Sequence, residues 1–175
     1  MQGMDGQRLM EALAATKSAI VKEWLARTLE SYPKHSCRFL SQEKDPFRNP
    51  VGVTLAEAFG ALFDQLIEGP EATTLSRLLE PIVRIRAVQD FSPSQAVAFL
   101  FLLKRVMRGT LGDELRCDPH GEGLAMVEAR IDDMALLAFD LFMKCREQIC
   151  QIKANEAKRR TFVWERLHRG RPDAG

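Results

Sequence analysis

Histidine is scarce in this sequence, and the cysteines form no recognisable motif. The only histidines are His35, His120 and His168, in predicted loops or near the C-terminus. None lies on an apolar helix face, so none is placed to ligate haem or a metal ion in a core. No C-x-x-C pair marks a zinc or thioredoxin-like site. We therefore expect no cofactor or metal, and free thiols that act mainly as small apolar side chains. The cysteines are Cys37, Cys117, Cys145 and Cys150.

Strong net charge and long apolar runs are also missing. The chain has 25 basic and 24 acidic residues and a formal net charge of +1. No global attraction to nucleic acid or to an anionic membrane is therefore expected. No apolar run approaches the roughly 20 residues that span a bilayer, and residues 1–5 lack the basic region and apolar stretch of a secretory signal. These absences predict a cytoplasmic protein without a membrane span.

The recurrent catalytic motifs are absent as well. There is no G-x-S-x-G sequence and no phosphate loop of the P-loop or Rossmann kind. Cys117 lies near His120 in a glycine-rich segment, but no third group is evident that would orient the pair for nucleophilic catalysis. Asp132 and Asp133 are adjacent on a predicted helix and point apart, as expected for a solvated face. The sequence predicts a protein that is not an enzyme.

What the sequence does have is helical periodicity. Hydrophobic residues make up 46% of its 175 residues, enough for the core of one domain. They recur at spacings of three and four, and the alternating pattern of strands is missing. Prolines and glycines separate predicted helices at 6–31, 52–68, 72–88, 93–110 and from 122 to about 169. We predict an all-α fold, with one helical domain over 6–150 and a basic helical extension over 151–175.

Several local predictions follow from the prolines. Pro81 is expected to split the helix at 72–88 into a short turn and a main segment, with Ile82, Ile85 and Val88 pointing inward. The polar stretch that reaches Val51 holds two prolines four residues apart, which favours a loop over a regular helix. Phe47 lies between those prolines, and we expect it to be buried as an apolar plug.

The helix at 93–110 has the clearest start signal. Ser92 can accept hydrogen bonds from the first helical turn, and Pro93 suits the first helical position, where its missing N–H costs nothing. Phe91, just before the cap, is placed to pack on Val97 or its neighbours as a hydrophobic staple. Since this helix is apolar nearly all round, we expect it to be the central and most buried one.

The last predicted helix is too long for the domain. From residue 122 to 169 it would measure roughly 70 Å at 1.5 Å per residue, so its C-terminal third must project or bind a partner. Residues 151–175 carry seven basic and three acidic side chains, a net charge of +4. We interpret this segment as a docking or self-association element; a plain solvated helix end and a nucleic-acid or lipid contact are the alternatives. The candidate docking or dimer residues are Ile149, Ile152, Arg159, Arg160, Phe162, Trp164 and Leu167.

A second group of polar residues precedes the helix at 93–110. It consists of Arg84, Arg86, Gln89 and Asp90, and we add Asp45 from the proline-containing loop. The plain interpretation is that these residues cap helix ends, with the arginines pairing with Asp45 or Glu80. The functional interpretation is a small pocket for an anionic or polar signal.

Two segments carry a family resemblance. Residues 43–52 read E-K-D-P-F-R-N-P-V-G, and residues 82–96 read I-V-R-I-R-A-V-Q-D-F-S-P-S-Q-A. In this order and spacing they resemble the N-terminal domain of RsbT co-antagonist proteins of the RsbRD type. The first helix, with Ile20, Trp24 and the Tyr32-Pro33 pair, fits the same pattern. The resemblance extends from about residue 9 to residue 150.

The resemblance implies a haem-free, globin-like, dimeric sensor module of bacterial stress signalling. In the better-known relatives a long helix joins this module to a STAS domain, which is phosphorylated and sequesters a kinase. No STAS domain follows within these 175 residues, so kinase sequestration is not carried over. Stand-alone copies also resemble proteins found beside redox-complex genes in anaerobic sulfate reducers.

These observations favour a regulatory sensor or adaptor that acts by protein contact and homodimerisation. Its expected partners are a second copy of itself and an unidentified protein, with no nucleic acid. Two alternatives remain open: an accessory or assembly protein of an anaerobic membrane redox complex associated with sulfite reduction, and a nucleic-acid or lipid binder that uses the basic extension.

Overall fold

The computed structural model describes residues 2–32, 37–40, 43, 45, 47–69, 71–89, 91–112 and 121–169, with the backbone alone for 2–6 and 163–169. Within these ranges the regular structure is helical and no strand occurs. The predicted all-α fold is therefore confirmed, and the helices form a single domain. The predicted likeness to globins stays a prediction.

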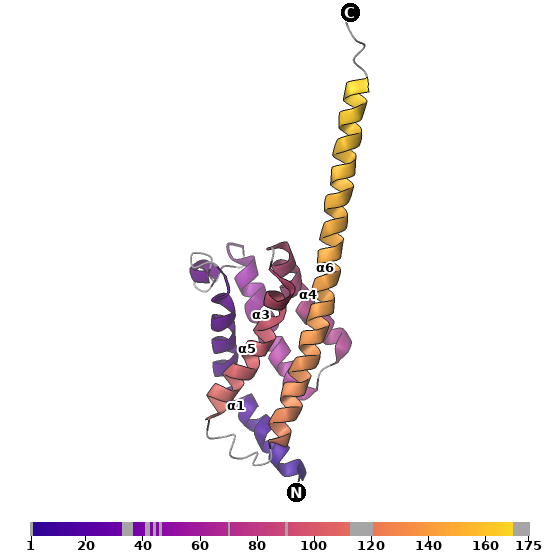
Figure 1. Cartoon of the computed structure of the whole chain (residues 1–175). Helices are drawn as coiled ribbons and strands as arrows, with labels where there is room; N and C mark the ends of the chain where they lie inside the picture. Colours follow the sequence, from indigo (N-terminus) through magenta and orange to yellow (C-terminus); the bar gives the residue numbers. More distant parts are fainter. Residues whose placement is uncertain are drawn as a thin grey trace, which may run out of the picture.

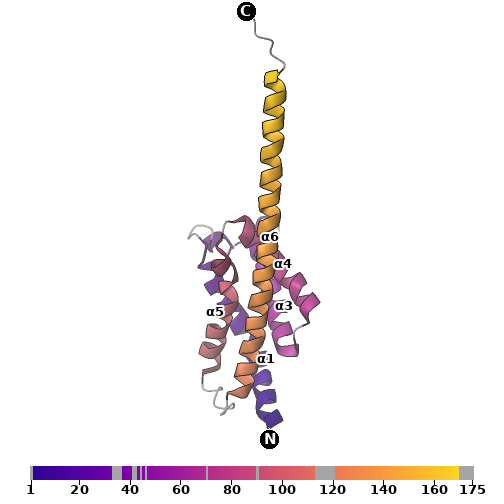
Figure 2. The same cartoon turned by 45° about the vertical axis from the view of Figure 1, so that its right-hand side comes forward.

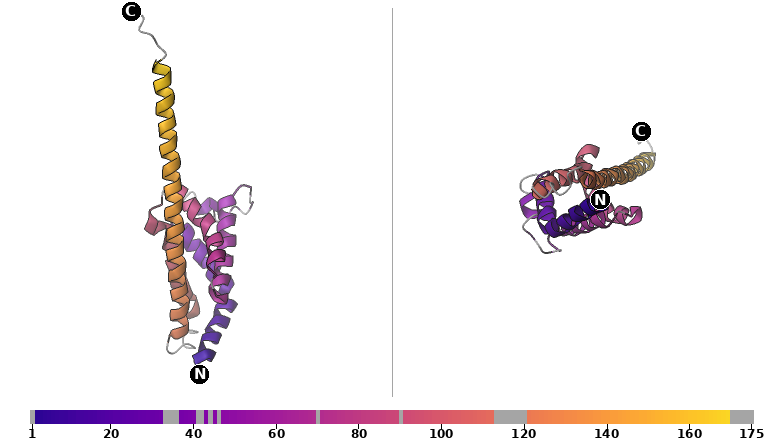
Figure 3. Two further views of the ribbon diagram at one scale, coloured as in Figure 1. Left: turned by 90° about the vertical axis from the view of Figure 1, so that its right-hand side faces the viewer. Right: turned by 90° about the horizontal axis from the view of Figure 1, so that it is seen from below.

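Figure 1 shows the helices packed beside the first half of the C-terminal helix, whose second half extends away from the others. The views in Figures 2 and 3 show the same projection from other sides. A further short helical segment lies at 37–40. The labelled helices are α1 (Gln2–Leu29), α3 (Pro50–Glu68), α4 (Ala72–Val88), α5 (Pro93–Leu111) and α6 (Glu122–Arg169).

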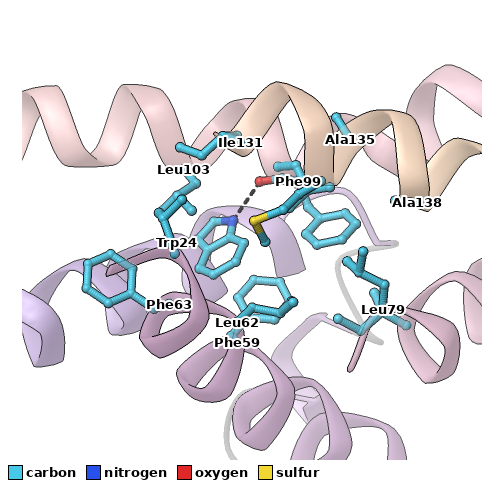
Figure 4. Packing of buried hydrophobic residues seen from close by; sticks show 14 of the residues in the cluster. Trp24, Phe59, Leu62, Phe63, Leu79, Phe99, Leu103, Ile131, Ala135 and Ala138 are labelled. Carbon is cyan, nitrogen blue, oxygen red and sulfur yellow. Dashed lines mark hydrogen bonds between the residues drawn. The ribbon is translucent and has the colours of Figure 1, made fainter. Parts of the chain in front are cut away.

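Trp24 of α1 occupies the centre of the packed helices. Its ring centroid lies 4.0 Å from that of Phe59 on α3 and 6.1 Å from that of Phe99 on α5. Its indole N–H donates to the main-chain carbonyl of Phe99 at 2.6 Å, which satisfies the one polar atom of a fully buried side chain. Figure 4 shows this bond inside the apolar cluster. One side chain therefore joins three helices.

Helix α6 completes the core, because it contacts each of the other four labelled helices. Arg130 donates to the carbonyl of Leu66 at 2.8 Å, at the end of α3. Arg146 donates to the carbonyl of Ala87 at 3.0 Å, at the end of α4. Helix C-termini carry unsatisfied carbonyls and partial negative charge, so a cation there is favourable. Arg130 and Arg146 thus fix α6 against the ends of two helices.

The prediction that the C-terminal third of the last helix projects from the domain is confirmed. The helix has 48 residues and measures roughly 70 Å at 1.5 Å per residue. Every residue from 151 to 162 is exposed, so no other part of the described chain packs closely against this stretch of α6. The helix therefore continues well past the last core residue, Cys145.

Helix α4 is continuous through Pro81, so the prediction of a split helix is wrong. Proline removes one helical hydrogen bond and crowds the carbonyl four residues before it. Here both Pro81 and Arg77, four residues before it, lie on the exposed side of the helix. The prediction that Ile82, Ile85 and Val88 of α4 all point into the core is also wrong in part. Ile82 is buried as expected, Ile85 is only partly buried, and Val88 is 66% exposed, whereas Arg86 is buried.

Helix α5 begins as predicted. Ser92 is its N-cap, and Pro93 opens the helix in a capping box completed by Gln95. Helix α5 has more buried residues than α3 or α4, in keeping with the expectation of the most buried helix, but one of its apolar residues, Phe101, is 46% exposed. The helix that touches all the others is α6, whose length lets it cross the ends of α3 and α4.

Helix α3 is the apolar core helix of the first half of the chain. By length and composition α3 could cross a membrane. The prediction that no apolar run approaches the length of a membrane span is therefore wrong. Leu55, Phe59 and Leu62 of α3 are fully buried against the other helices, and Asp64 pairs with Lys17 of α1. This packing accounts for the apolar composition of α3 within the folded domain.

Phe47 is 96% exposed, so the predicted apolar plug is wrong. It lies in a turn closed by Asp45, whose carboxylate accepts from the main-chain N–H of Phe47 at 2.9 Å. An Asx turn of this kind is stabilised by its own hydrogen bond and needs no buried side chain. The aromatic residue that anchors the core is Trp24.

We expect Trp24→Ala to lower the free energy of unfolding by about 3–5 kcal/mol, the usual cost of emptying a large buried aromatic site. Phe47→Ala is the matched control and should change it by less than about 0.5 kcal/mol, as for an exposed residue. Urea unfolding followed by circular dichroism measures both. Similar losses for the two variants would contradict this arrangement of the core.

The N-cap of α4 predicts a dependence of stability on pH. Glu71 accepts from the main-chain N–H groups of Thr73 and Thr74 and from the Thr74 hydroxyl. These bonds lower the pKa of Glu71 from 4.5 to about 2. A folded-state pKa below the unfolded value means that the stabilisation is present above pH 4.5 and is lost as the pH falls toward 2.

We therefore expect Glu71→Gln to lower the unfolding temperature at pH 6. The difference from the unsubstituted protein should shrink as the pH falls from about 4.5 toward 2, since the carboxylate that accepts these bonds becomes protonated. Thermal unfolding across this pH range measures it. A difference that stays constant with pH would show that the charge of Glu71 contributes nothing.

Candidate functional site

The first segment that carries the family resemblance is held by Asn49. Its side-chain amide donates to the carbonyls of Leu40 at 3.0 Å and Glu43 at 2.7 Å. Its side-chain oxygen accepts from the main-chain N–H of Gly52 at 2.9 Å, which caps α3. Asn49 is 1% exposed. A single buried amide therefore joins the loop to the start of α3.

Gly52 is required by this arrangement because of space. A Cβ atom at Gly52 would lie 2.2 Å from the amide nitrogen of Asn49 and 2.6 Å from the carbonyl oxygen of Leu40. Side chains essentially never approach so closely, so a larger residue would displace Asn49 from the bonds it makes. The N-P-V-G stretch is thus a packing motif in which the asparagine and the glycine depend on each other.

The second segment places Arg86 inside the protein. Its guanidinium carbon lies 4.9 Å from the ring centroid of Phe91, 5.2 Å from that of Phe99 and 5.5 Å from that of Tyr32. One terminal nitrogen donates to the carbonyl of Gln95 at 2.9 Å. Phe91 therefore packs against Arg86 and Tyr32, and its predicted contact with Val97 or its neighbours stays a prediction. The site lies where α1 and α4 end and α5 begins.

Burial dominates the electrostatics of this site. It lowers the pKa of Arg86, because the charged form loses its hydration, and Tyr32 partly opposes the shift. Burial also raises the pKa of Tyr32, while the nearby positive charge of Arg86 acts in the opposite direction. An arginine without a carboxylate partner is expensive to bury, and contact with aromatic faces recovers only part of that cost, about 2 kcal/mol when the cation is desolvated.

The predicted polar cluster is spread over several places. Arg84 is exposed and pairs with Glu80 at 2.7 Å, as the plain interpretation expected. Asp45 binds its own turn, and Gln89 is exposed at the end of α4. Among the described residues no hydrogen bond or ion pair joins these side chains to Arg86. Asp90 lies outside the described residues. The idea that the cluster binds a signal stays a prediction.

The predicted docking surface is exposed along most of its length. Ile149 is partly buried against the core, whereas Ile152, Arg159, Arg160 and Phe162 are exposed. The side chains of Trp164 and Leu167 lie outside the described part of the chain. Docking through this surface stays a prediction.

Sequence reasoning missed an exposed apolar patch on the part of α6 that contacts the other helices. Leu136 is 67% exposed, and Phe139 and Met143 are also exposed. Their spacing of three and four places them on one face of α6, on the side away from buried residues such as Ala138 and Phe142. Their helical spacing was visible in the sequence. The sequence did not show which of the two apolar faces of α6 the core would cover.

A shallow pocket lies between α1, α3 and the 37–40 segment. It encloses about 390 Å³ and has mostly apolar walls, including Leu25, Leu40 and Val53, with Lys22 and Glu57 also among its lining residues. Its walls are of the kind that ligand pockets use, but it offers few convergent polar groups. It is a weaker candidate than the Arg86 site.

The cysteines do not come together within the described part of the chain. Cys145 is buried, Cys37 is partly buried and Cys150 is exposed, so Cys145 and Cys150 lie on different faces of α6 as predicted. Cys117, His35 and His120 lie outside the described residues, as does the side chain of His168. Among the residues described, no group of three histidine, cysteine or acidic side chains could hold a metal ion.

We expect Asn49→Ala to lower the free energy of unfolding by about 2–3 kcal/mol, since it removes a helix cap and two further hydrogen bonds. Arg48→Ala is the control next to it: Arg48 is exposed and reaches Glu43 only at 3.4 Å, so about 0.5 kcal/mol or less is expected. Chemical unfolding measures both variants. Equal effects would show that the loop is not held by Asn49.

Comparison with known proteins agrees with these two segments. Residues 18–157 match the family described as the RsbT co-antagonist protein rsbRD N-terminal domain. The matched range covers most of the chain and includes both the Asn49 loop and the Arg86 site. No curated protein and no solved structure matches the chain. The chain therefore belongs to the RsbRD N-terminal domain family, a family of regulatory signalling domains.

Proposed function

We propose that this protein is a non-catalytic signalling module of the cytoplasm that acts as a homodimer and transmits its state through α6. The observation that carries the proposal is the exposed patch of Leu136, Phe139 and Met143, termed the α6 patch below. Large apolar side chains gathered on a solvent-exposed face mark interaction sites in soluble proteins.

The α6 patch continues onto α5. Lys104 pairs with Asp132 at 2.7 Å, and Arg108 pairs with Glu128 at 2.6 Å. These pairs set α5 and α6 antiparallel, with Phe101 at the level of residue 135. Since Phe101 is also exposed, the apolar surface spans two helices. An exposed apolar surface of this kind suits a two-fold contact, in which the same patch on each copy faces its counterpart.

The projecting part of α6 serves a different purpose in this proposal. Residues 151–169 carry six basic and two acidic side chains, and residues 151–162 are exposed. Two such segments side by side would repel each other, so this part of α6 is less suited to self-association than the patch. Its charge favours an acidic protein surface as the second partner.

We expect the intact protein to be a dimer at micromolar concentration and the double variant Leu136→Glu/Met143→Glu to be a monomer, because carboxylates would be buried in the contact. Val88→Glu, at another exposed apolar position, should remain a dimer. A chain ending at Gln151 should also remain a dimer, since the patch precedes the projecting part. Sedimentation velocity measures the oligomeric state.

Circular dichroism shows whether each variant keeps its helices. A monomeric unsubstituted protein, or a double variant that dimerises as tightly as the unsubstituted one, would contradict dimerisation through the α6 patch. Loss of the dimer on truncation after Gln151 would move the contact from the patch to the projecting part of α6.

A further inference from the structure

The hydrogen bonds of Arg86 leave one side of its guanidinium group unused. A guanidinium has five N–H donors in a fixed plane. In Arg86, Nη1 donates to the carbonyl of Gln95 at 2.9 Å, and Nη2 reaches the hydroxyl of Ser31 only at 3.5 Å. Nε has no hydrogen-bond partner among the described residues. The Nε and Nη2 donors lie side by side, in the geometry that binds both oxygens of one carboxylate.

No acidic side chain of the described residues compensates this charge. Arg86 takes part in none of the ion pairs found among the described residues. Its side chain is nevertheless buried, with only 1% of the residue exposed. Buried arginines are normally paired, because an isolated buried cation is strongly unfavourable. The aromatic rings of Tyr32, Phe91 and Phe99 stabilise the charge from their faces, and the Tyr32 hydroxyl lies close enough to affect the pKa of Arg86. None of the three side chains carries the negative charge that would balance the guanidinium.

Two further buried groups on α1 and in the turn that follows it are also without partners. The hydroxyl oxygens of Thr28 and Tyr32 form no hydrogen bond among the described residues. Thr28 and Tyr32 are four residues apart and both buried, and the Tyr32 ring lies against the guanidinium. Buried polar atoms usually have partners, so the unsatisfied Tyr32 hydroxyl and the unsatisfied Nε of Arg86, on side chains in contact with each other, are unusual.

We propose that the Nε and Nη2 edge of Arg86 binds a small planar oxyanion of the carboxylate class, with the hydroxyl group of Tyr32 as an additional donor. The anion is small and singly charged, because one cation balances it and aromatic rings enclose it. Since Arg86 is buried in the closed structure, we expect the anion to enter when the turn that contains Tyr32 moves briefly away from the end of α4. This inference goes beyond the proposed function and does not depend on the dimer.

The test uses the full chain with sodium formate and sodium acetate as probes, and sodium chloride at equal ionic strength as the reference. Formate and acetate present the planar pair of oxygens, and chloride does not. A ligand that binds only the folded protein raises its unfolding temperature in a saturable way. We expect a rise of about 3 °C or more at saturation with at least one of the two carboxylates, relative to chloride.

Two substitutions test whether the carboxylate-dependent rise in unfolding temperature depends on Arg86. Arg86→Lys keeps the charge but loses the paired donors, and we expect it to abolish the carboxylate-dependent rise. Arg84→Lys is the matched control, two residues away and exposed, and should keep the full rise. A rise that persists in Arg86→Lys, or that disappears equally in Arg84→Lys, would overturn the proposal.

Tyr32→Phe covers the case in which Arg86→Lys does not fold. It removes one hydroxyl and keeps the ring, so the variant should be at least as stable in chloride, because an unsatisfied buried group is gone. Its half-saturating carboxylate concentration should rise roughly tenfold or more, because a hydroxyl that donates to a carboxylate makes a charge-assisted hydrogen bond. An unchanged concentration would count against Tyr32 as a donor to the anion.

Nuclear magnetic resonance gives a direct readout. The side-chain Nε–H signal of Arg86 should shift as formate or acetate is added to the ¹⁵N-labelled protein, and the signal of Arg84 should not. No shift at saturating carboxylate would overturn the proposal. A carboxylate effect that is absent in the unsubstituted protein and arises only in Asp90→Asn would also overturn it, in favour of an ion pair within the chain.

Discussion

The packing of Trp24 is the interaction on which the rest of the domain depends. Its ring contacts Phe59 of α3 and Phe99 of α5, and its N–H bonds to the α5 main chain. Three helices thus share one buried side chain whose polar atom is satisfied within the core. Because the indole must meet one particular carbonyl, it sets the relative position of α1 and α5 more narrowly than apolar contact alone would.

Helix α6 both packs on this core and extends far beyond it. Its first half closes the domain, and Arg130 and Arg146 bind the carbonyl ends of α3 and α4. Any change in the position of those helix ends therefore bears directly on α6. Since α6 continues as one helix into its exposed part, a shift of its core-facing half would also move the exposed half.

The Arg86 site lies at the same end of α4 that Arg146 binds. Arg86 and Ala87 are neighbours, so the buried cation and the carbonyl held by α6 belong to one helical turn. An anion bound at Arg86 would stabilise the packing of α4 against α5 and against the turn after α1. It would thereby affect the end of α4, to which Arg146 of α6 is bound. The two segments that carry the family resemblance thus have distinct physical roles: Asn49 and Gly52 fix a loop, and Arg86 provides a buried charge.

The sequence by itself determined the helices, because apolar periodicity and the proline and glycine breaks act locally. The bounds of α4 and the start of α5 with Ser92 and Pro93 were predicted, as was the projection of α6. Tertiary packing decided which faces are buried. Phe47 and Phe101 are apolar yet exposed, whereas Arg86 and Asn49 are polar yet buried. Burial depends on neighbours that are distant in the sequence, such as Leu40 for Asn49 and Phe99 for Trp24, and local periodicity holds no information about which distant groups will meet.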